Sequence, residues 1–248
     1  MKTSKFGRKY NYIPDLSDHR DKIYVPKLTV PRPSKADVYA TCSPIDDQGQ
    51  LGSCGLNAAM SALADLEIKA GLPLVEFSRL FAYFNTRLGM GTVLEDSGVY
   101  LRDVIKSLMS TGVCEEKYWP YLTAIYQIPH FPWCYLDAAK HMITLYQRIL
   151  TLDDAKDSIA SGFPVIFGIP VYDSFESDEV SKTGIVPMPG PDEAQLGGHA
   201  IKMVAYDDDT QYVDFANSWG LGWGNLGYGK LPYKYFETMA DDAWEIER

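Results

Sequence analysis

The sequence predicts an α+β protein with two lobes, a mainly helical lobe followed by a β-rich one. Helical spacing of apolar residues dominates between about residues 50 and 150, whereas short apolar runs with β-branched residues dominate from about 151 to 240. The hydrophobic fraction of 46% in 248 residues is sufficient for a large core. Helices grouped in one half and strands in the other are typical of an α+β architecture.

Residues 1–40 show little periodicity. Prolines at 26, 31 and 33 favour an extended path, which is also compatible with a disordered tail. Tyr10, Tyr12 and Ile13 make this segment more apolar than such a tail requires. We therefore expect residues 1–40 to form an N-terminal strap or short pro-segment lying on a domain that spans residues 41–248.

A strong helix is predicted to begin at Cys54 and to end at Gly71, a candidate for a left-handed cap. Its apolar residues fall on one helical face: Leu56, Met60, Leu63 and Leu66. Further helices are predicted over residues 76–88, 98–112, 135–147 and 152–161. Buried strands are predicted over residues 162–171, 199–206 and 211–217, with a long irregular segment at 172–198.

Composition excludes several functional classes. The net charge of −10 argues against nucleic acid as a partner, because phosphate binding requires clustered Lys and Arg. No apolar run reaches the roughly 18 residues that cross a bilayer, and no signal peptide pattern is visible. We therefore expect no membrane partner, and a protein that is cytoplasmic or exported by a route that its sequence does not reveal.

The chain has four cysteines, too few for a disulfide scaffold. Cys114 and Cys134 are compatible either with buried thiols or with one bridge. Together with His130 and His141 they match no standard ligand spacing, so no metal site is expected.

The segment from Gln48 to Gly55 delivers Cys54 to the first turn of a helix. Unpaired backbone N–H groups and the helix dipole stabilise a thiolate there. Gln48 lies six residues upstream (54 − 48 = 6), where its side-chain amide can donate a hydrogen bond near the sulfur. Cys54 is therefore a candidate nucleophile.

His199 is the candidate base. If residues 207–209 form a three-residue hairpin loop, His199 pairs with Asn217 on the neighbouring strand. An asparagine there can accept the imidazole N–H and fix the ring while the other nitrogen faces a thiol. Trp219, two residues further on, is positioned to shield that hydrogen bond from water.

At these residues the chain resembles the papain-like cysteine peptidases. The match rests on Gln-Gly…Gly-Ser-Cys-Gly (48–55), Gly-His-Ala (198–200) and Asn-Ser-Trp-Gly…Trp-Gly (217–224), which occur in the family's order. His199 follows Cys54 by 145 residues (199 − 54 = 145) and Asn217 follows it by 163 (217 − 54 = 163), the second slightly long for the family.

The resemblance implies a two-lobed fold whose central helix begins at the nucleophile, with a β-barrel-like second lobe and a cleft between them. It implies Cys54 as nucleophile, His199 as general base and acid, Asn217 as its orienting group and Gln48 as oxyanion donor. Substrate backbone contacts are implied for Ser97, Gly98 and Gly198, with weaker candidates at Asp96 and Tyr100. The substrates are expected to be peptides or proteins, no cofactor is needed, and a monomer is expected.

The chain departs from the family pattern at two positions near the nucleophile. Leu51 stands in place of a cysteine that usually forms a disulfide, and Gly55 in place of the usual aromatic residue. Residues 14–21 resemble the short N-terminal segment of a microbial, xylellain-like branch. From the length and apolar content of residues 1–40, we hypothesise that they cross or flank the cleft and restrain access to it.

Two other functions are compatible with parts of this pattern. One is a catalytically silent papain-like fold used for binding, against which the intact set of Gln48, Cys54, His199 and Asn217 argues. The other is an amidase or transglutaminase acting on side-chain or cell-wall amides, against which the Asn-Ser-Trp-Gly segment argues.

Overall fold

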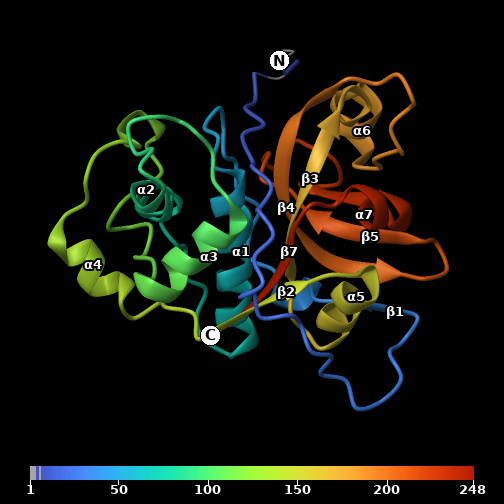
Figure 1. Cartoon of the computed structure of the whole chain (residues 1–248), viewed down its shortest axis with the longest axis horizontal. Coiled ribbons are helices and arrows are strands. Elements are labelled where there is room, and N and C mark those ends of the chain that lie inside the picture. The colour runs from blue at the N-terminus through green and yellow to red at the C-terminus, as the bar shows by residue number, and fades with distance from the viewer. Residues whose placement is uncertain (1–3, 6) are drawn as a thin grey trace.

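The structure is a computed structural model that describes residues 4, 5 and 7–248. Helices α1 to α4 lie on one side, and a sheet with helices α5 to α7 lies on the other (Figure 1). The N-terminal segment runs along the line between them (Figure 1). The predicted two-lobed α+β fold is confirmed.

The helical side is built around α1 (Cys54–Lys69), which is buried along most of its length, as its alanine-rich first half requires. Helix α1 ends as predicted, with Gly71 at φ +74° and the Leu72 N–H bonded to the Glu67 carbonyl. The other helices on this side are α2 (Arg79–Met90), α3 (Leu101–Ser110) and α4 (Pro132–Ala138). No helix in the described part of the chain is long and apolar enough to cross a membrane.

The second side carries a seven-stranded sheet in the order β2-β7-β3-β4-β5-β6, with β1 also paired to β4. Its strands are β1 (Lys35–Asp37), β2 (Leu145–Ile149), β3 (Val165–Tyr172), β4 (Gln195–Asp207), β5 (Tyr212–Ala216), β6 (Tyr228–Pro232) and β7 (Ala243–Glu247). Its helices are α5 (Leu152–Ala160), α6 (Asp178–Thr183) and α7 (Tyr233–Met239). The apolar run of β3 is fully buried through Val171, as predicted.

The helix predicted over residues 135–147 is wrong in its second half. Helix α4 begins at Pro132, whose fixed φ suits the first helical turn, and ends at Ala138. Residues 145–149 instead form β2, which pairs with β7 near the end of the chain. Local periodicity could not reveal this strand, because its partner lies about a hundred residues away.

The predicted register of the β4–β5 hairpin is also wrong. Four residues, 208–211, close the turn instead of three, and the register of β4 shifts at a bulge between Met203 and Ala205. Lys202 therefore pairs with Ala216, which sets Asn217 opposite Ile201 when the register is extended. Residues 199 and 201 lie on the same face of the strand, so His199 becomes the diagonal neighbour of Asn217 and stays within reach.

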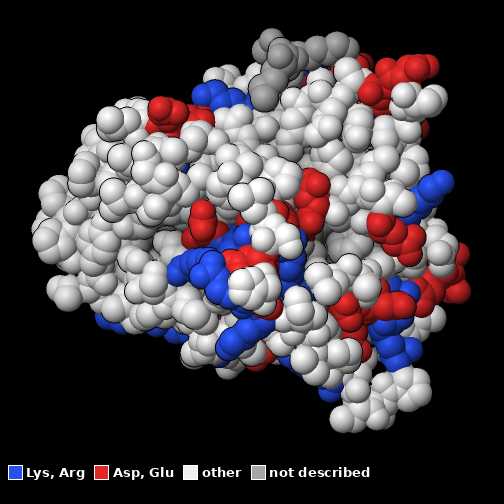
Figure 2. Space-filling model, in the orientation of Figure 1, with Lys and Arg blue, Asp and Glu red and all other residues white. Residues whose placement is uncertain are grey.

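The N-terminal segment pairs with both sides of the molecule. Asn11 forms a parallel bridge to Gly198 of the sheet, and Ile13 forms one to Tyr100 at the start of α3. Figure 2 shows basic and acidic side chains intermingled at the middle of this face. Asp21 of the N-terminal segment forms ion pairs with Arg102 and Arg148, at 2.7 and 2.9 Å.

A buried ion pair joins the helical side to the sheet. Lys202 of β4 binds Asp65 of α1, and both side chains are almost completely buried. Replacing Lys202 with methionine leaves the Asp65 carboxylate without its cation, so we expect a loss of about 3–5 kcal/mol in the free energy of unfolding. Urea denaturation measures this loss. The double variant Lys202→Met/Asp65→Leu is expected to recover most of it, and equal stability of the two variants would contradict the account.

Candidate active site

Cys54 is the first residue of α1, and its side chain is buried. Burial raises the pKa of the thiol to about 11, although the backbone N–H groups of Ala200 and Gly55 counteract part of this rise. The helix start therefore supplies the expected donors, but the dry surroundings favour the neutral thiol.

His199 lies on β4, fully buried, with its ring held by Asn217. The Nε2 atom lies 2.8 Å from Oδ1 of Asn217, and the Ser218 N–H donates to the same oxygen, also at 2.8 Å. Because that oxygen accepts from a backbone N–H, Nε2 of the neutral ring must be the donor. The Nδ1 atom consequently carries a lone pair, and it has no hydrogen-bond partner among the described residues.

Aromatic rings enclose the imidazole. Trp219 packs against it at a centroid distance of 4.9 Å, and Tyr10 of the N-terminal segment lies at 6.3 Å. Burial lowers the pKa of His199 to about 4, although the hydrogen bond to Asn217 opposes this shift. The predicted shielding by Trp219 therefore corresponds to a real contact.

Gln48 is fully buried and is tied to the segment that carries Asn217. Its backbone N–H donates to the Ser218 carbonyl at 2.9 Å, and its Oε1 accepts from the Ser218 hydroxyl at 2.6 Å. Its Nε2 donates to the Leu51 carbonyl at 3.0 Å, which leaves the second amide hydrogen for another acceptor. The sequence did not predict that Ser218 orients this amide, although Ser218 lies within the Asn-Ser-Trp-Gly segment.

The two predicted substrate-binding glycines both contact the N-terminal segment. Gly98 has φ +72°, and a Cβ there would lie 1.7 Å from the Asn11 carbonyl oxygen. The Gly198 carbonyl accepts from the Tyr12 N–H at 3.2 Å, and its own N–H donates to the Tyr10 carbonyl at the same distance. The hydroxyl of the third candidate, Ser97, lies 2.8 Å from that of Thr92.

The model of the papain family cysteine proteases matches residues 32–240. The chain belongs to this family. It is 37% identical to xylellain, a cysteine protease from Xylella fastidiosa, whose structure superimposes with a TM-score of 0.92 over 100% of this chain and 98% of that one. An uncharacterized peptidase C1-like protein of Acanthamoeba polyphaga mimivirus is 34% identical over 100% of this chain and 89% of its own length. A cathepsin B-like protein of Giardia intestinalis is 28% identical over 86% and 74%.

Membership of the papain family makes the chain a cysteine peptidase and hence a hydrolase. Its departure at Gly55 has a structural reason. A Cβ at this position would lie 3.0 Å from a methyl of Val99 and 3.3 Å from one of Leu101. The segment leading into α3 therefore packs so closely on the start of α1 that an aromatic side chain at residue 55 does not fit without displacing it.

Asp96, a weaker candidate from the sequence, connects three parts of the site. Its carboxylate accepts from the Gly52 N–H at 3.0 Å and from the Tyr83 hydroxyl, and it pairs with Lys9 at 2.7 Å. Its carbonyl accepts from the Asn11 amide. Tyr100, the other weaker candidate, contributes its backbone to the bridge with Ile13.

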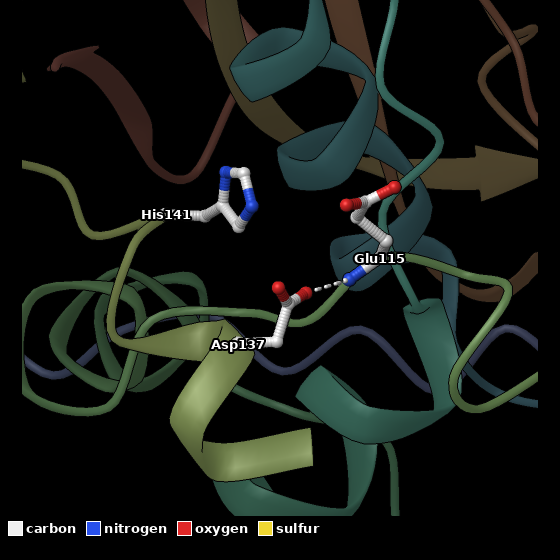
Figure 3. A group of neighbouring side chains, drawn as sticks. All are labelled: Glu115, Asp137 and His141. Carbon is white, nitrogen blue, oxygen red and sulfur yellow. Dashed lines mark hydrogen bonds between the residues drawn. The ribbon is translucent and has the colours of Figure 1, made fainter. Parts of the chain in front are cut away.

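The four residues considered as metal ligands lie in three different surroundings. Cys114 and Cys134 are free buried thiols in contact with each other, which favours the thiol alternative over a bridge. His130 is packed among aromatic rings, the nearest being Trp119 at 4.4 Å. His141 lies with Glu115 and Asp137, within 4.8 Å at their polar atoms (Figure 3).

The carboxylates around His141 already have partners. Asp137 accepts from the Glu115 N–H at 3.0 Å and from Lys140 at 2.9 Å, and Glu115 pairs with Lys117 at 2.7 Å. These contacts neutralise both acids, so the group is explained by interactions within the protein.

Proposed function

We propose that this protein is a cysteine endopeptidase that hydrolyses peptide bonds through an acyl-enzyme on Cys54. The Cys54 sulfur attacks the scissile carbonyl, and His199 carries the thiol proton to the leaving amine. Water activated by the same imidazole then hydrolyses the thioester and regenerates the thiol. The observation that carries this proposal is the single orientation of His199, whose Nε2 is committed to Asn217 while Nδ1 remains free for the thiol.

Gln48 is the proposed oxyanion donor, together with the backbone N–H of Cys54. A donor is effective in this role when its direction is fixed before the reaction. The hydrogen bonds to Ser218 and Leu51 fix the amide of Gln48 in this way. Its buried setting strengthens the interaction with a developing negative charge.

Replacing Asn217 with alanine tests the proposed role of this residue. Without its acceptor, the His199 ring can rotate and change tautomer, so we expect kcat to fall on the order of 10- to 100-fold with little change in KM. Turnover of a fluorogenic peptide measures this effect. The exposed Asn225 provides a matched control in Asn225→Ala. Full activity of the Asn217 variant would contradict the proposed role.

We also propose that the N-terminal segment restrains this activity. Residues 10–13 make main-chain contacts with Gly198 and with the backbone beside Gly98, the positions implied for substrate. Arg8 reinforces the contact, because its Cζ lies 4.8 Å from the centroid of the Trp219 ring and its guanidinium donates to the Trp219 carbonyl. A peptide can enter this part of the cleft only after the segment leaves it.

The uncharged state of Cys54 and His199 in the covered site should be visible in the pH dependence of Cys54 alkylation. Burial holds the thiol pKa of Cys54 at about 11 and the imidazole pKa of His199 at about 4, and both shifts disfavour the thiolate–imidazolium pair. Displacing the segment admits water, so the thiol pKa should fall and the imidazole pKa should rise.

Alkylation of Cys54, followed by mass spectrometry from pH 5 to 11, tests this expectation. In the intact chain the rate is expected to increase up to about pH 11, since only the thiolate reacts. In an Arg8→Ala/Tyr10→Ala variant the plateau should begin at a lower pH. Identical profiles would show that the segment does not set the protonation of the site.

A further inference from the structure

Tyr12 of the N-terminal segment pairs with the backbone of β4 just before the candidate base. Its N–H donates to the carbonyl of Gly198, the residue directly before His199, at 3.2 Å. Its side chain is buried in the same core cluster as Cys54 and Ala200. The segment thus presents one side chain to a fixed position on strands β3 and β4, against Gly168 and the residue before His199.

Two glycines make room for this ring. A Cβ at Gly168 of β3 would lie 2.0 Å from Cζ of Tyr12, and a Cβ at Gly198 would lie 2.8 Å from its Cδ1. Any other residue at position 168 would therefore close the space where the ring lies. We call the space bounded by Gly168, Gly198 and Asp242 the Tyr12 pocket.

Asp242 lies at the far end of the Tyr12 pocket and is only 3% exposed. Its Oδ2 accepts from the Tyr12 hydroxyl and from the Asp15 N–H, so both of these donors come from the N-terminal segment. Its Oδ1 accepts from Arg148 at 2.7 Å. When the segment leaves, Oδ2 loses both of these donors, whereas Oδ1 keeps its cation.

We propose that the Tyr12 pocket is a specificity pocket that selects peptide substrates with tyrosine at the position that binds there. This inference rests on the proposed function. A tyrosine hydroxyl restores the hydrogen bond to Asp242, whereas phenylalanine fills the same space and leaves a buried carboxylate oxygen unpaired. A lysine or arginine side chain is disfavoured, because Arg148 already supplies the cation.

A positional-scanning library of fluorogenic peptides tests the selection, using the full-length chain and its Tyr12→Ala variant. We expect one position on the acyl side to prefer tyrosine over phenylalanine by at least about tenfold in kcat/KM. Asp242→Asn should bring this ratio close to one, and Gly168→Val should reverse the ratio between tyrosine and alanine peptides. Equal use of tyrosine and phenylalanine, or a preference for arginine or lysine, would overturn the proposal.

A second measurement does not depend on turnover. Tyr12→Gly creates a space that p-cresol matches, so p-cresol should raise the Tm of this variant more than toluene does. Equal increases in Tm from p-cresol and toluene would overturn the proposed pocket, whether or not the chain is an active peptidase. Conversely, if no peptide cleavage that requires Cys54 is detected, the proposed function is contradicted. That outcome does not bear on the chemistry of the pocket.

Discussion

Replacing Cys54 with alanine is expected to abolish peptide hydrolysis, with a loss on the order of 10⁶-fold in kcat. The loss is large because the sulfur forms the covalent intermediate, and neither His199 nor Gln48 can take its place. Turnover of a peptide substrate by the purified chain measures this effect.

Cys42→Ala is the matched control, because this half-buried thiol lies outside the site and donates to the Val38 carbonyl at 3.5 Å. It should retain full activity. Unchanged hydrolysis in the Cys54 variant would overturn the assignment of the nucleophile. Labelling of Cys54 without turnover of any peptide would instead favour a binding protein with a silent papain-like fold.

Loosening the N-terminal segment is expected to increase turnover. Tyr10 contacts the rings of His199 and Trp219 and donates to Glu176 at 2.5 Å, so Tyr10→Ala removes both packing and a hydrogen bond to a charged group. A contact of this kind is worth about 1.5–3 kcal/mol, which corresponds to roughly ten- to a hundredfold more of the open form. The open form alone admits substrate, so kcat/KM should rise by a similar factor.

Arg20→Ala is the control for a change in the same segment. Arg20 is exposed and pairs with Asp18, away from the rings around His199. Its removal should leave turnover unchanged. If Tyr10→Ala and Arg20→Ala have the same effect on a folded chain, the segment does not act by covering the site.

The sequence allowed the central helix and the set of candidate residues to be predicted, because both depend on local signals. The Gly-rich segment before Cys54 and the apolar spacing after it define α1. The hydrogen bond between His199 and Asn217 was also predicted, although the register was wrong. It survives because a shift of two residues keeps both side chains on one face of the sheet.

The remaining features depend on partners far away in the chain. Strand β2 exists because β7 lies beside it, and no property of residues 145–149 alone indicates that pairing. Tyr10 and Tyr12 stood out as aromatic residues in a polar segment, but their partners Glu176 and Asp242 follow more than 160 residues later. Likewise, the small residue at position 55 becomes explicable only once Val99 is known to pack against it.

The most direct test is the rate at which a thiol-directed epoxide labels the intact chain and the Tyr10→Ala variant at one pH, read by mass spectrometry of the labelled peptide. We predict slow labelling confined to Cys54 in the intact chain, and labelling of the same residue at least about tenfold faster in the variant. Equal rates in the two proteins, or modification of Cys42 in place of Cys54, would contradict a papain-family site covered by its own N-terminal segment.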